Sequence, residues 1–440
     1  MNTRKHTYWK TAGLAVCVMV TLLSGCSSKT DSAGQADAGE KPAEQKPVTI
    51  RVGIKSQGYL TEDEFKRYIT EPVKKKYPWI TVEMSIYNAK GSKLSELVAA
   101  GNVPDIVITN NVNGMPEFLD LDLVTPLDEL IQKHRLDLSR LEPQAVEAVK
   151  AATQRQDITA LPYARNFHAL YYNKDIFDKF AVPYPKDGMT WDQVTELAKK
   201  LTRDDNGTAY RGLMPNVPER LAAQLSAPFV NPATNKAGIE TPEWKRVLDM
   251  TTAIHSIPGN SPILFNKEAS DLFYKERTLA MLADINLLGD LSAFQDFHWD
   301  MVSFPVWPEL PGTSPGIDAH LMVLSKTSSN KDDAFRVISA VLSDEVQMDM
   351  SRQGRYSVLK DSKIKDAFGL DLTWMAGKNL KAVNMTPAKP YAQTVYDKEG
   401  ITAVRNALKA SVKDGKDTNT ALREAAEAFN KKIDEINAGK

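Results

Sequence analysis

The sequence predicts an α/β protein with two lobes. From residue 48 onward, strand-like segments alternate with helix-like segments, which favours a largely parallel sheet covered by helices. The chain has 440 residues, more than a single hydrophobic core usually organises. No internal repeat is visible, so we expect two different lobes rather than a repetitive array.

The first residues are typical of a bacterial secretory leader. Arg4, Lys5 and Lys10 precede an uncharged apolar stretch over 12–23, which is shorter than the roughly 20 residues that span a bilayer. This pattern predicts a signal peptide over 1–25. The segment Leu23-Ser24-Gly25-Cys26 resembles a lipobox, the processing motif of bacterial lipoproteins. The resemblance implies acyl chains of the palmitate type on Cys26 and a protein held at the extracellular face of the cell membrane. An ordinary secretory leader is the alternative.

The composition after the leader excludes several classes of function. Because the leader holds 25 residues with three Lys/Arg and no acid, the mature chain has 415 residues, 52 bases and 56 acids. That balance does not favour binding to nucleic acid. Cys17 leaves with the leader and lipid would consume Cys26, so we expect no disulfide, cysteine metal site or cysteine nucleophile. Residues 26–47 lack aromatic and large aliphatic side chains and are predicted to be a flexible tether.

Strands and helices follow one another in the first part of the body. Apolar residues recur with a period of two over 48–54 and 80–86, and with helical spacing over 62–76 and 94–98. The segment 104–108 ends in the continuous apolar run Ile106-Val107-Ile108, as expected of a short strand buried on both faces. Ligands of such sheets lie beyond the carboxyl ends of the strands. The candidate ligand contacts here are therefore Ser56 and Gln57 after the first strand, and Asn110 and Asn111 after the third.

Later segments continue the pattern. Residues 169–172 predict a strand, and Thr190 with Gln193 forms a capping box before a helix with an apolar stripe. Asp204-Asp205-Asn206-Gly207 is predicted to be a tight turn, with a calcium loop as the weaker alternative. Leu422, Phe429 and Ile433 predict a final amphipathic helix.

Four stretches share motifs with one known family: 93–106 with its Pro104-Asp105 step, Leu161-Pro162-Tyr163 through Tyr171-Tyr172-Asn173-Lys174-Asp175, Leu279-Ala280-Met281, and 325–335. They resemble the extracellular solute-binding proteins of ABC importers, family 1, which includes maltose-binding protein. The resemblance implies a two-lobed periplasmic-binding-protein-like fold of type II, in which discontinuous lobes are joined by crossing strands. The implied N-terminal lobe is 48–165 with 321–356, and the C-terminal lobe is 170–315 with 357–440. The crossings are expected near 165–169, 316–320 and 354–357.

The resemblance also implies a function. A lipid-anchored monomer would capture a sugar or oligosaccharide between its lobes and deliver it to the permease subunits, with no cofactor, no metal and no chemistry of its own. The chain departs from the family at 282–287, which lacks the usual Gly and Trp, and at 353–356, which lacks the usual proline. These departures affect the ligand contacts that the resemblance implies, so the identity of the sugar stays open.

A sugar site needs aromatic platforms and side chains that donate and accept hydrogen bonds. The candidates in the second half are Trp307 and Trp374, with core packing as the alternative role of each. At the first crossing, Arg165 and Asn166 are ligand candidates or, alternatively, form hydrogen bonds to the hinge backbone. Asp284 and Asn286 follow a predicted strand and complete the set.

Catalytic signatures are scarce. The spacing G-x-S-x-G occurs at Gly312-Thr313-Ser314-Pro315-Gly316, in a segment predicted to be a long loop rather than the strand-to-helix turn of a nucleophile elbow, and there is no H-E-x-x-H pattern. A glycosidase needs two opposed carboxylates, which a chain with 56 acids could always supply. The alternatives to a transport receptor are therefore a surface polysaccharide-degrading enzyme and a passive carbohydrate-binding adhesin.

Overall fold

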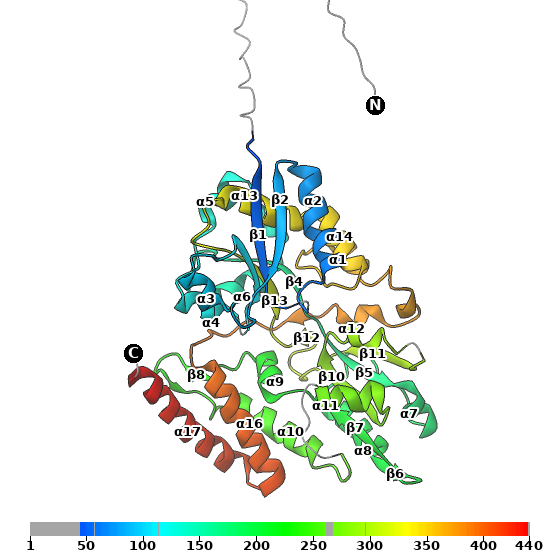
Figure 1. Cartoon of the computed structure of the whole chain (residues 1–440). Coiled ribbons are helices and arrows are strands. Elements are labelled where there is room, and N and C mark those ends of the chain that lie inside the picture. Colours follow the sequence, from blue (N-terminus) through cyan, green and yellow to red (C-terminus); the bar gives the residue numbers. More distant parts are fainter. Residues whose placement is uncertain (1–44, 57, 113, 261–266, 295, 439–440) are drawn as a thin grey trace, which may run out of the picture. The chain divides into compact units, whose positions relative to one another are not determined.

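Two five-stranded sheets carry the two lobes of the chain (Figure 1). The computed structural model describes residues 45–56, 58–112, 114–260, 267–294 and 296–438. The predicted leader, Cys26 and all of the predicted tether before residue 45 lie outside the described residues. Buried apolar side chains of the first lobe form one core, and those of the second lobe form two further cores. The α/β class predicted from the sequence is confirmed.

The first sheet has the strand order β2-β1-β3-β13-β4. Its strands are β1 (Val48–Ile54), β2 (Ile80–Ile86), β3 (Ile106–Asn110), β4 (Leu161–Arg165) and β13 (Ala319–Leu324). As predicted, β1 pairs in parallel with β2 and β3, because helical segments return the chain to the same end each time. In contrast, β13 is antiparallel to both β3 and β4. It pairs His320 with Asn110, so it starts beside the end of β3.

The second sheet has the order β11-β5-β10-β7-β6 and contains a single parallel pair, β7 with β10. Its strands are β5 (His168–Asn173), β6 (Arg203–Asp205), β7 (Thr208–Met214), β10 (Leu279–Ile285) and β11 (Trp299–Ser303). The prediction of a largely parallel sheet is therefore wrong for this lobe. Strands β10 and β11 flank β5 and run opposite to it, toward the end where β5 begins.

Two short ladders and one hairpin turn complete the β-structure. The ladders join β8 (Val230–Asn231) with β9 (Lys236–Ala237), and β12 (Thr313–Ser314) with β14 (Thr386–Pro387). Asn206 and Gly207 connect β6 to β7 with φ of 53° and 82°, the left-handed pair that a two-residue hairpin turn requires. The Gly207 amide donates to the Asp204 carboxylate (3.1 Å). This confirms the predicted tight turn.

Helices of the first lobe come from both ends of its discontinuous sequence. They are α1 (Glu62–Phe65), α2 (Glu71–Lys76), α3 (Leu94–Ala99), α4 (Met115–Asp120), α5 (Asp128–Lys133), α6 (Pro143–Thr153), α13 (Lys331–Val341), α14 (Asp344–Arg352), α15 (Ser362–Asp366) and the 3₁₀ turn Leu138–Arg140. The helix predicted over 62–76 is present, but a π-helical turn, Lys66–Thr70, separates α1 from α2. Pro72 explains the wide turn, because its ring would collide with the carbonyl four residues earlier in a regular helix.

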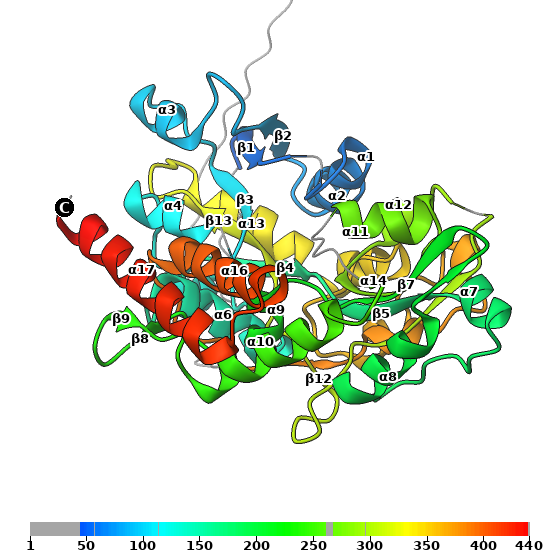
Figure 2. The same cartoon turned by 90° about the horizontal axis from the view of Figure 1, so that it is seen from below.

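Helices of the second lobe include the two longest in the described chain. They are α7 (Lys174–Lys179), α8 (Trp191–Leu201), α9 (Pro218–Gln224), α10 (Pro242–His255), α11 (Lys267–Ser270), α12 (Leu288–Leu291), α16 (Asp397–Asp414), α17 (Thr418–Ala438), the π turn Asp271–Lys275 and the 3₁₀ turns Thr373–Met375 and Leu380–Val383. The capping box of Thr190 and Gln193 forms as predicted at the start of α8. The last helix, α17, lies against α16 and buries Leu422, Phe429 and Ile433 (Figures 1 and 2).

The core of the first lobe extends beyond the residues expected for it. Ile317 and Ala319 belong to this core, ahead of the expected start at 321. Val358, Leu359 and Ile364 also belong to it, past the expected end at 356. An isolated β-bridge between Leu141 and Leu359 attaches this extension to the lobe.

Candidate functional site

Three chain segments hydrogen-bond to one another where the two sheets are connected. The Asn166 amide donates to the Asp318 carbonyl (2.8 Å), and the Arg165 amide donates to the Tyr356 carbonyl (3.0 Å). The Asn166 side chain also donates to the Asp318 carboxylate (3.2 Å). Arg165 and Asn166 thus lie between the other two segments. All of these residues fall within the three ranges in which crossings were expected.

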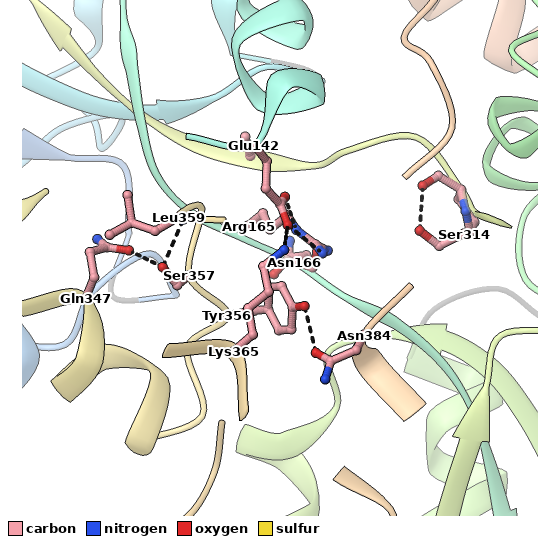
Figure 3. A network of polar contacts seen from close by, with 12 residues as sticks. Glu142, Arg165, Asn166, Ser314, Gln347, Tyr356, Ser357, Leu359, Lys365 and Asn384 are labelled. Carbon is pink, nitrogen blue, oxygen red and sulfur yellow. Dashed lines mark hydrogen bonds and ion pairs between the residues drawn. The ribbon is translucent and has the colours of Figure 1, made fainter. Parts of the chain in front are cut away.

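A buried ion cluster holds the first crossing (Figure 3). Arg165 Nε donates to Glu142 Oε2 (2.8 Å), and Lys365 Nζ donates to Glu142 Oε1 (2.5 Å). The side chains of Arg165 and Glu142 are only 3% and 6% exposed. The guanidinium carbon lies 4.0 Å from the centroid of the Tyr356 ring, a cation–π distance, and Tyr356 donates to Asn384 Oδ1 (2.8 Å). These contacts hold the Arg165 side chain against Glu142 and Tyr356 within the crossing.

Polar side chains of the first lobe gather beside the crossings. Asn110, at the end of β3, donates to the Tyr59 hydroxyl (2.7 Å), and the ring centroids of Tyr59 and His320 are 4.9 Å apart. Burial raises the pKa of Tyr59, and the negative charge of Asp318 raises it further. Burial lowers the pKa of His320 to about 4, because it disfavours the imidazolium. At neutral pH this group therefore offers a neutral imidazole, a phenol and an amide.

A matching polar group lies on the second lobe at the end of β10. Asp284 Oδ1 accepts from Asn216 Nδ2 (3.0 Å) and from Arg220 Nη1 (3.4 Å). Burial raises the pKa of the Asp284 carboxyl, while the charge of Arg220 opposes the shift. His168 is buried nearby, and burial, reinforced by Arg220 and Arg165, holds its pKa well below the ordinary value.

The second group is adjacent to the first crossing. In the β5–β10 ladder, Asp284 pairs with Ala169, only three residues after Asn166. The backbone amide of Asn286 donates to the carbonyl of Phe167 in the crossing itself (3.1 Å). Polar side chains from both lobes therefore flank the same connecting segments.

The predicted ligand residues of the first lobe have different environments. Ser56 is exposed after β1, and Gln57 lies outside the described residues. Asn110 belongs to the polar group of the first lobe. Asn111 is only 2% exposed, and its side chain accepts from the Ala319 amide (2.6 Å) and donates to the Ile317 carbonyl (3.0 Å). Its amide thus fastens the second crossing to β3.

The predicted ligand residues of the second lobe also lie in different environments. Asp284 and Asn286 lie beside the crossing, and Asn286 is exposed. Trp307 is 3% exposed in the second core, where its ring centroid is 6.4 Å from that of Trp191. Trp374 is half-buried against Trp299, with ring centroids 6.3 Å apart. Both tryptophans thus pack against other tryptophan rings of the second lobe.

Several polar residues of these groups had not been singled out from the sequence: Tyr59, Asn216, Arg220, Asp318 and His320. Tyr59 follows the first strand by five residues, so the rule that selected Ser56 could have included it. Asn216 and Arg220 follow β7 in the same way, but no strand had been predicted over that segment. Asp318 and His320 lie inside the expected second crossing.

The described residues contain no group of three or more His, Cys, Asp or Glu side chains placed to hold a metal ion. Within the same residues, no helix has the length and apolar character needed to cross a membrane.

Comparison with known proteins assigns the family. Residues 69–370 match the model of the bacterial extracellular solute-binding protein family, a match that covers more than half of the chain. The chain belongs to this family. Its members are binding proteins that work in the extracellular or periplasmic space. No curated protein matches the sequence.

Solved structures share the fold at low sequence identity. An ABC substrate-binding protein of Listeria monocytogenes, in complex with cycloalternan, is 21% identical, with 89% of this chain and 99% of that one covered and a TM-score of 0.69. The sugar-binding protein MalE of Xanthomonas citri is 16% identical, with coverages of 89% and 98% and a TM-score of 0.69. UgpB of Mycobacterium tuberculosis, in complex with glycerophosphocholine, is 16% identical, with coverages of 90% and 100% and a TM-score of 0.66. The fold is thus the two-lobed fold of periplasmic binding proteins.

Proposed function

We propose that this chain is the substrate-binding protein of an ABC importer and captures a sugar or oligosaccharide between its lobes. The observation that supports this proposal is the pair of polar groups beside the crossings, one from each lobe. A solute that contacts both groups binds more tightly when the lobes are closed, and this difference in affinity drives closure. The crossing segments absorb the change in backbone dihedral angles.

The chemistry of the two groups favours an uncharged, hydroxyl-rich solute. Tyr59, Asn110 and Asn216 offer donors and acceptors, as sugar hydroxyls require. Arg220 and Asp284 compensate each other's charge, so neither an anion nor a cation finds an unpaired partner there. The Listeria and Xanthomonas proteins bind sugars, which agrees with this preference, whereas the Mycobacterium protein binds glycerophosphocholine. Glycerophosphocholine therefore belongs in any ligand test.

The remaining parts of the proposal concern anchoring and delivery. The lipobox-like segment that ends at Cys26 supports a lipid anchor at the extracellular face of the membrane. The receptor acts as a monomer and presents the closed form to the permease, and separate subunits hydrolyse ATP. Cys26→Ala should leave the leader attached and abolish labelling by radioactive palmitate. Wild-type protein found in the medium with an unmodified Cys26 would contradict the anchor.

Binding is tested with the mature chain and a panel of mono- and oligosaccharides plus glycerophosphocholine. A ligand at 100 times its dissociation constant should stabilise the protein by about 2.7 kcal/mol in a thermal-shift assay. Asp284→Asn should weaken binding of that ligand about tenfold or more, because Arg220 loses its counter-charge at the site. The control is Asp434→Asn on α17, whose carboxylate is 62% exposed.

Two further measurements separate the alternatives. Solution scattering should give a smaller radius of gyration with bound solute. An unchanged profile at saturating ligand would favour a rigid adhesin over a transport receptor. Release of products from labelled oligosaccharides would instead identify a polysaccharide-degrading enzyme.

A further inference from the structure

A separate hollow lies at the other end of the second sheet. Its volume is about 440 Å³, within the range of small-molecule sites, and its walls include Lys174, Asp178, Tyr184, His298, Trp299 and Lys378. In the β5–β11 ladder Trp299 pairs with Asn173, whereas Asp284 pairs with Ala169 on the other side of β5. Ala169 and Asn173 are four positions apart on β5, about 13 Å along the sheet. We call this feature the α7–β11 hollow.

An exposed aromatic ring is fixed at the wall of the α7–β11 hollow. Tyr184 is 36% exposed, one of the few large apolar side chains in the described chain that are exposed. Its ring packs against Tyr172 and Phe177 at centroid distances of 5.4 and 6.0 Å. Its hydroxyl donates to Asp178 Oδ1 (2.6 Å). The ring is therefore held on two sides and still meets solvent, as an aromatic platform for a sugar must.

Two lysines bring hydrogen-bond donors to the same walls. Lys378 Nζ donates to the Trp299 carbonyl (2.8 Å) and lies 4.1 Å from the centroid of the Trp299 ring. Lys174 Nζ lies 5.3 Å from the centroid of the Tyr184 ring. Neither ammonium forms an ion pair with a carboxylate in the part of the chain that the structure describes. Because an ammonium has three donors, both lysines retain donors for a ligand. Partial burial lowers the pKa of Lys378, in keeping with a cation that lacks a carboxylate partner.

Carboxylates supply the acceptors. Asp175 contacts His298 Nδ1 (2.9 Å), and Asp300 accepts from the backbone amides of Met301 (2.8 Å) and Asn379 (2.9 Å). With Asp178, the walls carry three acids against two lysines, so the charge is close to balanced. A free anion would face three carboxylates, and a cation would face two ammonium groups. A neutral ligand with many hydroxyls can use both kinds of group.

We propose that the α7–β11 hollow is a second binding site, one that takes a neutral sugar ring independently of the site at the crossings. Tyr184 provides the platform, the two lysines donate to ring hydroxyls, and Asp178 accepts from them. This site goes beyond the proposed function and does not depend on it. It would hold a second sugar, or a distant part of a long one, on the outer part of the second lobe.

The test uses the mature chain labelled with 5-fluorotryptophan, and its probes are maltotriose and mannotriose. Trp299→Phe assigns the fluorine resonance of Trp299, which should shift as either sugar is added at millimolar concentrations. Lys378→Met keeps the apolar stem and removes the ammonium, and it should weaken this response about tenfold. Asp178→Asn, at an exposed position, should weaken the Trp299 response as well. It provides the test if Lys378→Met does not fold. Arg220→Met alters the site at the crossings and should leave the Trp299 response unchanged.

Three results would overturn the proposal: no Trp299 shift with either sugar, a shift that survives both Lys378→Met and Asp178→Asn, or a shift abolished by Arg220→Met. Sodium phosphate and choline chloride are the charged probes. A Trp299 response to one of them without a response to sugar would contradict the proposal that the ligand is neutral. A Trp299 response without any binding that depends on Arg220 would count against the proposed function alone.

Discussion

Replacing Glu142 by glutamine would leave two cations, Arg165 and Lys365, without their shared counter-charge. The guanidinium of Arg165 is the critical group, because its side chain is 3% exposed and water cannot replace the lost carboxylate. Removing one partner of a buried pair costs about 3–5 kcal/mol. The glutamine carbonyl can still accept one hydrogen bond, so we expect Glu142→Gln to lower the free energy of unfolding by about 3 kcal/mol.

The assay is urea unfolding of the mature chain at pH 7, followed by tryptophan fluorescence. The matched control is Glu427→Gln on α17, which removes the partner of Arg423 from a pair whose side chains are 54% and 61% exposed. Such exposed pairs contribute about 0.2–1 kcal/mol, so this control should unfold almost as wild type does. If Glu142→Gln and Glu427→Gln changed stability equally, the reasoning from burial would be refuted.

Three further predictions concern buried groups. Burial lowers the pKa of His255 to about 4, and both ring nitrogens lack a partner in the described chain, so the folded state binds its proton less readily than the unfolded state does. Stability should therefore fall as the pH drops from 6.5 towards 4, by on the order of 3 kcal/mol, and His255→Leu should flatten this dependence in urea titrations at several pH values. Asn111→Ala leaves an amide and a carbonyl of the second crossing unpaired and should cost about 1–3 kcal/mol in chemical unfolding, and an unchanged midpoint would contradict the fastening role. A Cβ on Gly212 would lie 2.2 Å from the Ala198 carbonyl oxygen, so Gly212→Ala should lower the melting temperature by several degrees, whereas Gly289→Ala, with open space around it, should not.

Much of the secondary structure follows from local sequence. The alternation over 48–54 and 80–86 appears in the structure as β1 and β2 with the same bounds. Thr190 caps α8 as its spacing predicts, because a capping box involves only four consecutive residues. The turn at Asn206 and Gly207 is equally local, since it depends on backbone conformations that these two residues adopt readily.

The direction of the strands within each sheet was harder to predict from the sequence. The sequence alternates strands and helices in both lobes, yet β13 and β5 run antiparallel to their neighbours. The direction of a strand depends on which end of the sheet the chain enters. At the crossings, the chain enters a sheet from the other lobe, so the end at which it enters cannot be predicted from a local sequence pattern.

The roles of the candidate site residues were decided by tertiary structure. Arg165 could have faced a solute, but Glu142, 23 positions away, and Tyr356 occupy its guanidinium. Trp307 lies in a proline-rich segment typical of a loop, yet packing near Trp191 places it in the second core. By itself the sequence determined the α/β class, several strands, the cap of α8 and the family motifs, because these depend on neighbouring residues. The partners of each polar side chain come from segments far apart in the chain, and only the folded arrangement decides which of them meet.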